Sequence, residues 1–224
     1  MKLLVLDTET TGLDPNTCKM IELAAVQYHV ETKTVLGSIQ TLIYNHENPC
    51  ESINNISVAA LEAARDLHGP YYDTLRHMAQ TSDYIVAHNA EFDKGFVDKA
   101  IGDLGKPWIC SKKDLRFPRA GKSRRLGHLA YDHGIPVLNA HRSLDDVNIL
   151  VSLLGVLTPE ELISQIEDAK LPKFLWEAKT TYDQKELPKA AGFFWDAGVR
   201  AWRKNMNDKE ASLINNFPIV KVSQ

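Results

Sequence analysis

The first ten residues constrain the fold of this chain most strongly. Residues 3–6 form an uninterrupted apolar run (LLVL), and Asp7 and Glu9 follow it directly. A run of this kind is typical of a strand buried on both faces of a sheet. Residues i and i+2 of a strand share a face, so the two carboxylates should emerge together where the core ends. Because adjacent carboxylates repel each other, this pattern indicates either a divalent metal site or an ordinary solvated strand end.

Two clusters downstream favour the metal site. Residues 88–93 (HNAEFD) follow a second apolar run and place Asp93 at the start of an expected helix. Residues 141–146 (HRSLDD) open another expected helix. Because five residues turn a helix by about 140° beyond one full turn, His141 and Asp146 can serve one site only if His141 lies in the entering loop or first turn. Each cluster alone is typical of a helix cap, but together they complete a set of four carboxylates and one histidine.

The order and spacing of this set resemble the His subclass of the DEDD exonuclease superfamily (DEDDh), to which the proofreading subunits of bacterial replicases belong. The resemblance covers residues 1–157, and residues 106–113 (KPWICSKK) look most similar to the exonuclease X subfamily. Carried over by position, it implies that the metal-site carboxylates are Asp7, Glu9, Asp93 and Asp146 and that the general base is His141.

The resemblance also implies a fold, a reaction and a cofactor. The fold would be α/β, with a mixed β-sheet flanked by helices, as in ribonuclease H-like exonucleases. The reaction would be metal-dependent 3′–5′ release of nucleoside monophosphates from DNA, with a preference for single-stranded 3′ ends, in repair or proofreading. The cofactor would be Mg²⁺, two ions per site, with Mn²⁺ able to substitute.

The chemistry of phosphodiester hydrolysis gives a reason for each catalytic residue. Two ions ~3.5–4 Å apart can ionise a water and neutralise the charge on the phosphoryl and leaving oxygens. We expect Asp7 to bridge both ions and Asp93 to support the second. Glu9 and Asp146 would complete the site of the attacking water. The imidazole of His141 can accept a proton from that water.

Two alternatives to a deoxyribonuclease stay open. The first is a 3′–5′ exoribonuclease that trims RNA or short oligoribonucleotides, because a 2′-hydroxyl is recognised by contacts outside the catalytic motifs. The second is a nucleic-acid-binding protein that has lost catalysis, which the intact set of five residues disfavours. The sequence contains no Gly-x-Ser-x-Gly elbow, P-loop or zinc-type cysteine pair that would indicate another chemistry.

Substrate contacts are expected next to the catalytic set and in a basic run. Seven Lys or Arg residues lie between positions 112 and 125, where they could follow the phosphate backbone or form a solvated helix and loop. One departure from the family is visible at residues 53–57 (INNIS), where many relatives carry Ile-His-Gly-Ile-Thr, so the nucleotide contacts of that loop stay open. The predicted substrate-binding residues are Thr8, Thr10, Gly12, Leu13, Asn89, Phe92, Lys112 and Arg124.

The chain is expected to divide near residue 170. Residues 1–170 would form the exonuclease domain and residues 171–224 a small C-terminal α+β module with an expected β-hairpin. The module contains nine Lys or Arg and six Asp or Glu, a charge of +3, so the remainder carries −6 of the total of −3. Its tryptophans could stack on bases or form the core of the module, and the two roles are compatible. They are three of the four in the chain: Trp176, Trp195 and Trp202.

Strands with interleaved helices predict an α/β layer architecture for the first domain. Strands are expected at 2–7, 20–29, 35–42, 84–87 and 108–110. Helices are expected at 58–64, 71–81, 91–101, 112–117, 126–133, 142–157 and 158–169.

Composition favours a cytoplasmic protein that is not inserted in a membrane. The hydrophobic content of 44% and charged content of 25% are ordinary for a globular chain. No apolar run approaches 18 residues, and the first strand carries acids where a signal peptide would be apolar. The three cysteines, Cys18, Cys50 and Cys110, form no disulfide motif, which fits a reducing compartment.

Overall fold

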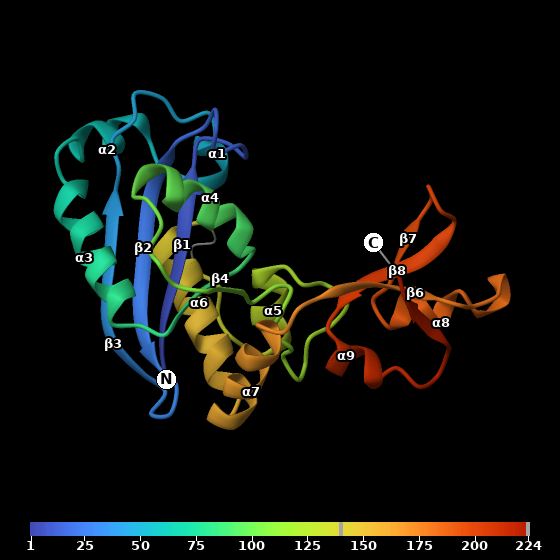
Figure 1. The fold of residues 1–224 in the computed structure, drawn as a ribbon. Helices are drawn as coiled ribbons and strands as arrows, with labels where there is room; N and C mark the ends of the chain where they lie inside the picture. The colour runs from blue at the N-terminus through green and yellow to red at the C-terminus, as the bar shows by residue number, and fades with distance from the viewer. Residues whose placement is uncertain (139–140, 223–224) are drawn as a thin grey trace. The chain divides into compact units, whose positions relative to one another are not determined.

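The computed structural model describes residues 1–138 and 141–222. The chain separates into two compact units, Met1–Ile166 and Glu167–Gln224. Figure 1 traces both units from the blue N-terminus to the red C-terminus. The division falls close to the boundary expected at residue 170.

The first unit is built on a five-stranded mixed sheet in the order β3-β2-β1-β4-β5. β1 (Lys2–Thr10) pairs antiparallel with β2 (Met20–His29) and parallel with β4 (Tyr84–Ala87). β3 (Thr34–Leu42) adds an antiparallel edge, and β5 (Trp108–Cys110) adds a parallel one. The predicted α/β fold class, a mixed sheet flanked by helices, is confirmed.

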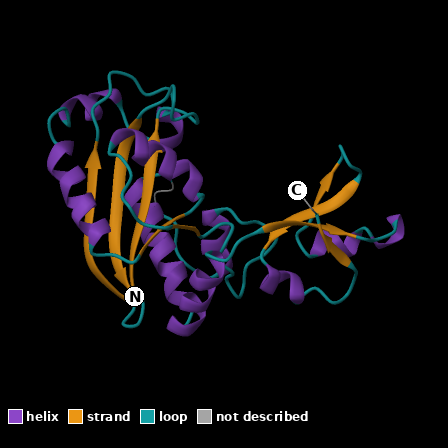
Figure 2. Cartoon of the chain, viewed as in Figure 1, coloured by secondary structure: helices purple, strands orange, loops and turns teal. Residues whose placement is uncertain are grey.

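Helices cover the sheet, as Figure 2 shows in purple. Leu4 and Leu6 of β1 point into a core shared with two of the helices, while the alternate residues of β1 point to the opposite face. The helices of this unit are α1 (Glu51–Asn54), α2 (Val58–Ala63), α3 (His68–Gln80), α4 (Ala90–Ala100), α5 (Leu126–Asp132), α6 (Ser143–Val156) and α7 (Pro159–Ala169). The core around Leu4 and Leu6 is completed by residues of α3 and α4, and α6 packs across β1 and β2.

No single helix in the described residues is long and apolar enough to cross a membrane. One pair of helices, α6 and α7, reaches the required length and composition when the two are taken together, but they are bent by 109° at the break between them. Val147, Leu150 and Leu153 of α6 are buried in the first unit.

Two sequence predictions need correction. The helix predicted over residues 112–117 is wrong: residues 111–114 form a turn, residues 115–117 are irregular, and the carboxylate of Asp114 accepts a hydrogen bond from the backbone of Cys110 at 2.9 Å. Pro118 follows directly, and the residue before a proline avoids the helical conformation. The helix predicted to start at residue 71 begins at His68 and holds Pro70 in its first turn, where no backbone N–H is needed.

The second unit is a small four-stranded antiparallel sheet in the order β7-β8-β6-β9. The predicted hairpin is confirmed as β7 and β8. Phe193, Met206 and Phe217 form the core, with Trp176 and Trp202 packed partly against it. The elements are β6 (Phe174–Ala178), a 3-10 helix η1 (Tyr182–Gln184), α8 (Glu186–Ala190), β7 (Phe194–Asp196), β8 (Ala201–Met206), α9 (Asp208–Ser212) and β9 (Ile219–Lys221).

Candidate active site

The end of β1 carries the first two predicted catalytic residues. β1 runs to Thr10, so Asp7 and Glu9 lie inside the strand rather than beyond it. The register with β2 places Asp7 opposite Ala24 and Glu9 opposite Glu22. Because the carboxylates alternate with buried residues, both point away from the α3 and α4 core and toward the face that α6 covers.

Asp93 lies in α4, the helix that follows the neighbouring parallel strand β4, and contacts β1 from there. The chain leaves β4 and turns at Asn89, whose φ of 87° lies in the left-handed region that asparagine tolerates better than most residues. The first turn of α4 then brings Asp93 beside Thr8. The backbone N–H and the hydroxyl of Thr8 donate hydrogen bonds to Asp93 Oδ1 at 3.1 and 2.9 Å. Asp93 is 2% exposed, so Thr8 holds a buried carboxylate in place.

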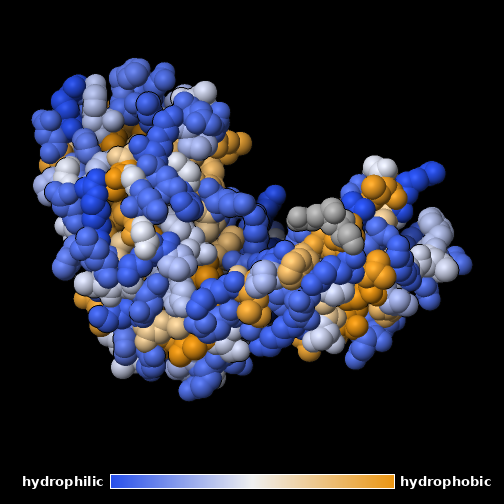
Figure 3. Space-filling model, in the orientation of Figure 1, coloured by the Kyte–Doolittle hydropathy of each residue, from blue (hydrophilic) through white to orange (hydrophobic). Residues whose placement is uncertain are grey.

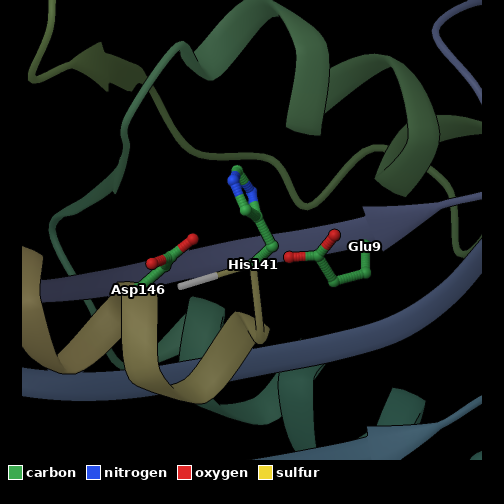
Figure 4. Close-up of side chains that lie close together, drawn as sticks. All are labelled: Glu9, His141 and Asp146. Atoms are coloured by element: carbon green, nitrogen blue, oxygen red, sulfur yellow. The ribbon is translucent and has the colours of Figure 1, made fainter. Parts of the chain in front are cut away.

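His141 lies in the loop that enters α6, as the spacing required. Its φ of 63° is also left-handed, and α6 begins two residues later at Ser143. Figure 4 shows the side chains of Glu9, His141 and Asp146 converging from β1, the loop and α6. One possible ligand atom from each of these three residues lies within 4.8 Å of the others.

All five predicted catalytic residues line one pocket of about 400 Å³. A neighbouring pocket of about 490 Å³ shares Asp7, His141 and Asp146. Of the predicted substrate contacts, five line the first pocket (Thr8, Thr10, Gly12, Leu13 and Phe92) and two line the second (Asn89 and Lys112). The second pocket is also lined by Arg125 and His128, which were not among the predicted contacts.

Arg124 lines neither of the two pockets. Its guanidinium donates to the carbonyls of Lys112 and Ser111 at 3.2 Å each and to the carbonyl of Leu115. These bonds hold the turn after β5 in shape. A contact between Arg124 and substrate stays a prediction.

His88 fastens the same loop to the end of β4. One ring nitrogen lies 2.9 Å from the hydroxyl of Ser111, and the other lies 2.9 Å from the carbonyl oxygen of Arg124. Burial, together with the nearby cations, lowers the pKa of His88 to about 4, so the ring is neutral at physiological pH. Sequence reasoning named this residue only as part of a motif.

Glu22 was missed by sequence reasoning. It lies on β2 with no exposed surface, and it accepts hydrogen bonds from Arg142 at 2.7 Å and from the backbone of Ser143 at 3.0 Å. Burial disfavours its charge, but the bonds from Arg142 and Ser143 outweigh burial and lower the pKa of Glu22. The first turn of α6 has no side-chain cap of its own, so Glu22 caps it from the sheet. The only sequence signal was an acid inside an apolar strand.

The loop at residues 53–57 is built around buried Asn54. Its side-chain oxygen accepts from the side chain of Asn48 at 2.9 Å and from the backbone of Ile56 at 3.1 Å. Asn48 also donates to the carbonyl of Ile56 at 2.7 Å. The residue that replaces the family histidine therefore shapes the loop. Ile53 beside it is 55% exposed and lines the pocket that holds the five predicted catalytic residues.

Burial and mutual repulsion raise the pKa values of the four carboxylates. Burial, followed by the charges of the other three, raises the pKa of Asp7 well above its ordinary value. Burial and the charge of Asp146 raise the pKa of Glu9 to about 8. Burial raises the pKa of Asp93 to about 7 despite the bonds from Thr8, and burial also raises the pKa of Asp146.

This donor set fits a divalent cation. Carboxylate oxygens are hard ligands of the kind that Mg²⁺ and Mn²⁺ prefer, and positive charge among them would offset the repulsion that raises their pKa values. The group within direct ligand reach is Glu9, His141 and Asp146, with Asp7 and Asp93 outside it. The proximity suits His141 as a ligand or as a base, and its role as the base stays a prediction.

Two sequence profiles divide the chain in the same way as the structure. The profile of the exonuclease family, RNase_T, matches residues 4–154. A domain of unknown function, DUF8626, matches residues 174–222.

Similar proteins include replicative polymerase chains. DNA polymerase III subunit epsilon of Treponema pallidum is 29% identical over 168 residues, which cover 67% of this chain and 74% of that protein. DNA polymerase III PolC-type of Thermotoga petrophila is 28% identical over 192 residues, which cover 82% of this chain. The matched part is only 14% of the PolC-type protein.

Solved structures show the same fold. The zinc-bound complex of Escherichia coli exonuclease I with single-stranded DNA has a TM-score of 0.62 at 18% identity, covering 80% of this chain and 48% of that one. Exonuclease X in complex with 5′ overhanging duplex DNA has a TM-score of 0.53 at 24% identity, covering 73% and 98%. The family profile spans more than half of the chain, and the predicted resemblance is thereby confirmed. This chain belongs to the exonuclease family.

Proposed function

We propose that this protein is a divalent-metal-dependent 3′–5′ exonuclease that releases nucleoside monophosphates from single-stranded 3′ ends of DNA. The observation that carries the proposal is the convergence of Asp7, Glu9, Asp93, His141 and Asp146 on one pocket at the end of β1. Membership of the exonuclease family supports hydrolysis and dependence on a divalent metal. The similarity to a polymerase III epsilon subunit supports DNA as substrate and a role in proofreading or repair.

The carboxylates would hold two Mg²⁺ ions, which Mn²⁺ could replace. When bound, these cations supply Lewis-acid stabilisation of the charge that develops on the phosphoryl and leaving oxygens. Thr8 keeps Asp93 oriented for this task, and the hydrogen bond that Glu22 accepts from the start of α6 keeps Asp146 and His141 at the pocket. His141 is exposed, so its imidazole is accessible to the attacking water and can accept its proton.

The apolar side chains at the rim of the pocket favour a substrate with a single-stranded 3′ end. Leu13 is 85% exposed and Ile53 is 55% exposed, and both line the catalytic pocket. Apolar side chains of this kind contact the faces of unstacked bases, which a base pair inside a duplex does not offer. Lys112 and Arg125 in the neighbouring pocket would contact the backbone phosphates.

A cytoplasmic location is part of the proposal. Cys18, Cys50 and Cys110 are all free thiols in the structure, which suits a reducing compartment.

The test is digestion of matched 5′-labelled single-stranded DNA and RNA, with Mg²⁺ or with EDTA. We expect a ladder that shortens from the 3′ end, on DNA and only with Mg²⁺. Faster digestion of RNA would identify an exoribonuclease instead. If the protein bound DNA but digested none of it in the presence of Mg²⁺ or Mn²⁺, it would be a binding protein, and the proposal would be overturned.

A further inference from the structure

The second unit contains a pocket of its own that the proposed reaction does not use. Its volume is about 650 Å³, within the range of small-ligand sites. The side chains that matter for recognition are three aromatic rings and three cations: Tyr182, Trp195, Trp202, Lys179, Lys185 and Arg200. All of them lie between residues 177 and 202, inside the second unit.

The sheet of this unit forms one wall of the pocket. Trp195 on β7 lies directly opposite Trp202 on β8, and Trp202 lies opposite Ala178 on β6. Directly paired residues share a face, so these three form one row across the sheet. The segment after β6, which includes η1, supplies Tyr182 and Lys185 to the same pocket.

Two of the rings are exposed although the unit has a core to bury them in. Tyr182 is 80% exposed and Trp195 is 50% exposed. Figure 3 shows that aliphatic and other strongly hydrophobic residues of this unit also reach the surface. Trp202 packs partly against the core and meets Trp195 at 5.5 Å between ring centroids with the planes 63° apart. Trp202 therefore holds Trp195 in place, and Trp195 stays half exposed to solvent.

Positive charge surrounds these rings. Lys185 lies 4.3 Å above the ring of Tyr182. Within the described part of the chain, Arg200 forms no ion pair with an acid. The one carboxylate in the lining, Glu177, is shared by Lys179 and Arg203. The lining thus has three cations and one acid, and because Lys179 already pairs with that acid, the cations left for a ligand are Lys185 and Arg200.

We infer that this pocket binds single-stranded DNA, with one base stacked on Trp195, another on Tyr182, and the phosphates beside Arg200 and Lys185. Aromatic faces with nearby cations are the recurring means of holding single strands without sequence preference. A duplex offers no free base faces, and an apolar peptide would gain nothing from the cations. That the strand is DNA rests on the proposed function, whereas the stacking site rests on the second unit alone.

The experiment measures binding of labelled oligothymidylate to the full chain in EDTA, where no strand is cut. Trp195→Ala and Tyr182→Ala should each weaken binding about 5- to 150-fold, the loss that corresponds to one stacked base. Trp195→Phe should recover most of the affinity, because it restores an aromatic face. Arg200→Ala should lower the slope of log affinity against log salt by about 0.7.

Matched controls lie beside the pocket. Phe194→Ala removes a ring that is 51% exposed, next to Trp195 but outside the lining, and should leave binding unchanged. Lys189→Ala removes an exposed cation outside the lining and should leave the salt slope unchanged. Thermal melting of each variant establishes that it is folded.

The outcomes separate this inference from the proposed function. Equal affinity of wild type, Trp195→Ala and Tyr182→Ala, all folded, overturns the inference even when DNA is digested normally. Loss of binding in these two variants supports it even when no digestion is found. Tighter binding of oligouridylate overturns the assignment to DNA. A proline-rich peptide that binds the pocket while oligothymidylate does not would assign it to a protein partner and overturn the inference.

Discussion

Glu22 and Arg142, 120 residues apart in the chain, form an ion pair of 2.7 Å that joins β2 to the start of α6. The Glu22 side chain has no exposed surface, whereas that of Arg142 is 34% exposed. The same carboxylate accepts the backbone N–H of Ser143. The pair therefore fixes the loop that carries His141 against the strand that faces Glu9.

The unequal burial of this pair predicts unequal mutational costs. Arg142→Met leaves a fully buried carboxylate without its cation and should destabilise the protein by about 3–5 kcal/mol. Glu22→Gln leaves a partly exposed guanidinium that water can solvate, so it should cost less. Urea denaturation of both variants measures the difference. An equal or larger loss for Glu22→Gln would contradict this account.

Asp7→Asn should weaken cation binding and slow digestion together. Asp7 is buried at the pocket among three other carboxylates, and loss of its charge removes stabilisation of the transition state. We expect the rate to fall by at least about 10²-fold. Mn²⁺ affinity, measured by calorimetry, should fall in parallel. Asp66→Asn, which changes an exposed acid outside both catalytic pockets, is the control and should alter neither quantity.

His141→Ala should slow turnover by about 10²–10⁴-fold, the usual contribution of a general base. Affinity for single-stranded DNA in EDTA should stay the same, because the proposed role of the imidazole is to accept a proton. His46→Ala removes an exposed imidazole outside the two catalytic pockets and is the matched control. A turnover within threefold of wild type would remove His141 from the role of base.

The metal-free protein should become less stable as pH rises from about 6.5 to about 8. Burial raises the pKa of Glu9 to about 8 and that of Asp93 to about 7, so the folded state binds more protons than the unfolded state in this window. The free energy of unfolding must then fall as pH rises. His88, with its pKa lowered to about 4, has the opposite effect, but only below about pH 6.5.

Urea denaturation in EDTA at both ends of this window measures the effect. Asp93→Asn keeps an oxygen that can accept from Thr8 but cannot ionise, so its stability should change less with pH than that of wild type. Saturating Mg²⁺ should reduce the dependence further, because a cation favours the charged carboxylates. If the free energy of unfolding rose with pH in EDTA, ionisation of these carboxyl groups would not destabilise the folded protein, and this account would be wrong.

Local geometry predicted part of the candidate site, whereas the catalytic roles of its residues came from the resemblance to a known family. Alternation along β1 places Asp7 and Glu9 on one face, and the spacing from His141 to Asp146 requires the histidine to lie in the loop. Apolar runs predicted the strands for the same reason, since a buried strand needs continuous apolar residues. The turn at residues 112–117 was missed because a basic, helix-compatible composition outweighed the signal of Pro118.

The sequence by itself determined, through the family resemblance, which residues are proposed to bear the chemistry, and the period of the strand that places Asp7 and Glu9 on one face. Only the tertiary structure decided how distant segments support that chemistry. Glu22 caps α6, and Arg124 donates hydrogen bonds to backbone carbonyls. Trp195 lines a pocket, and Trp202 lines the same pocket and also packs partly against the core. Each of these roles depends on contacts that the periodicity of a single helix or strand does not predict. The free energy of such a contact is gained only when the chain folds and brings the residues together.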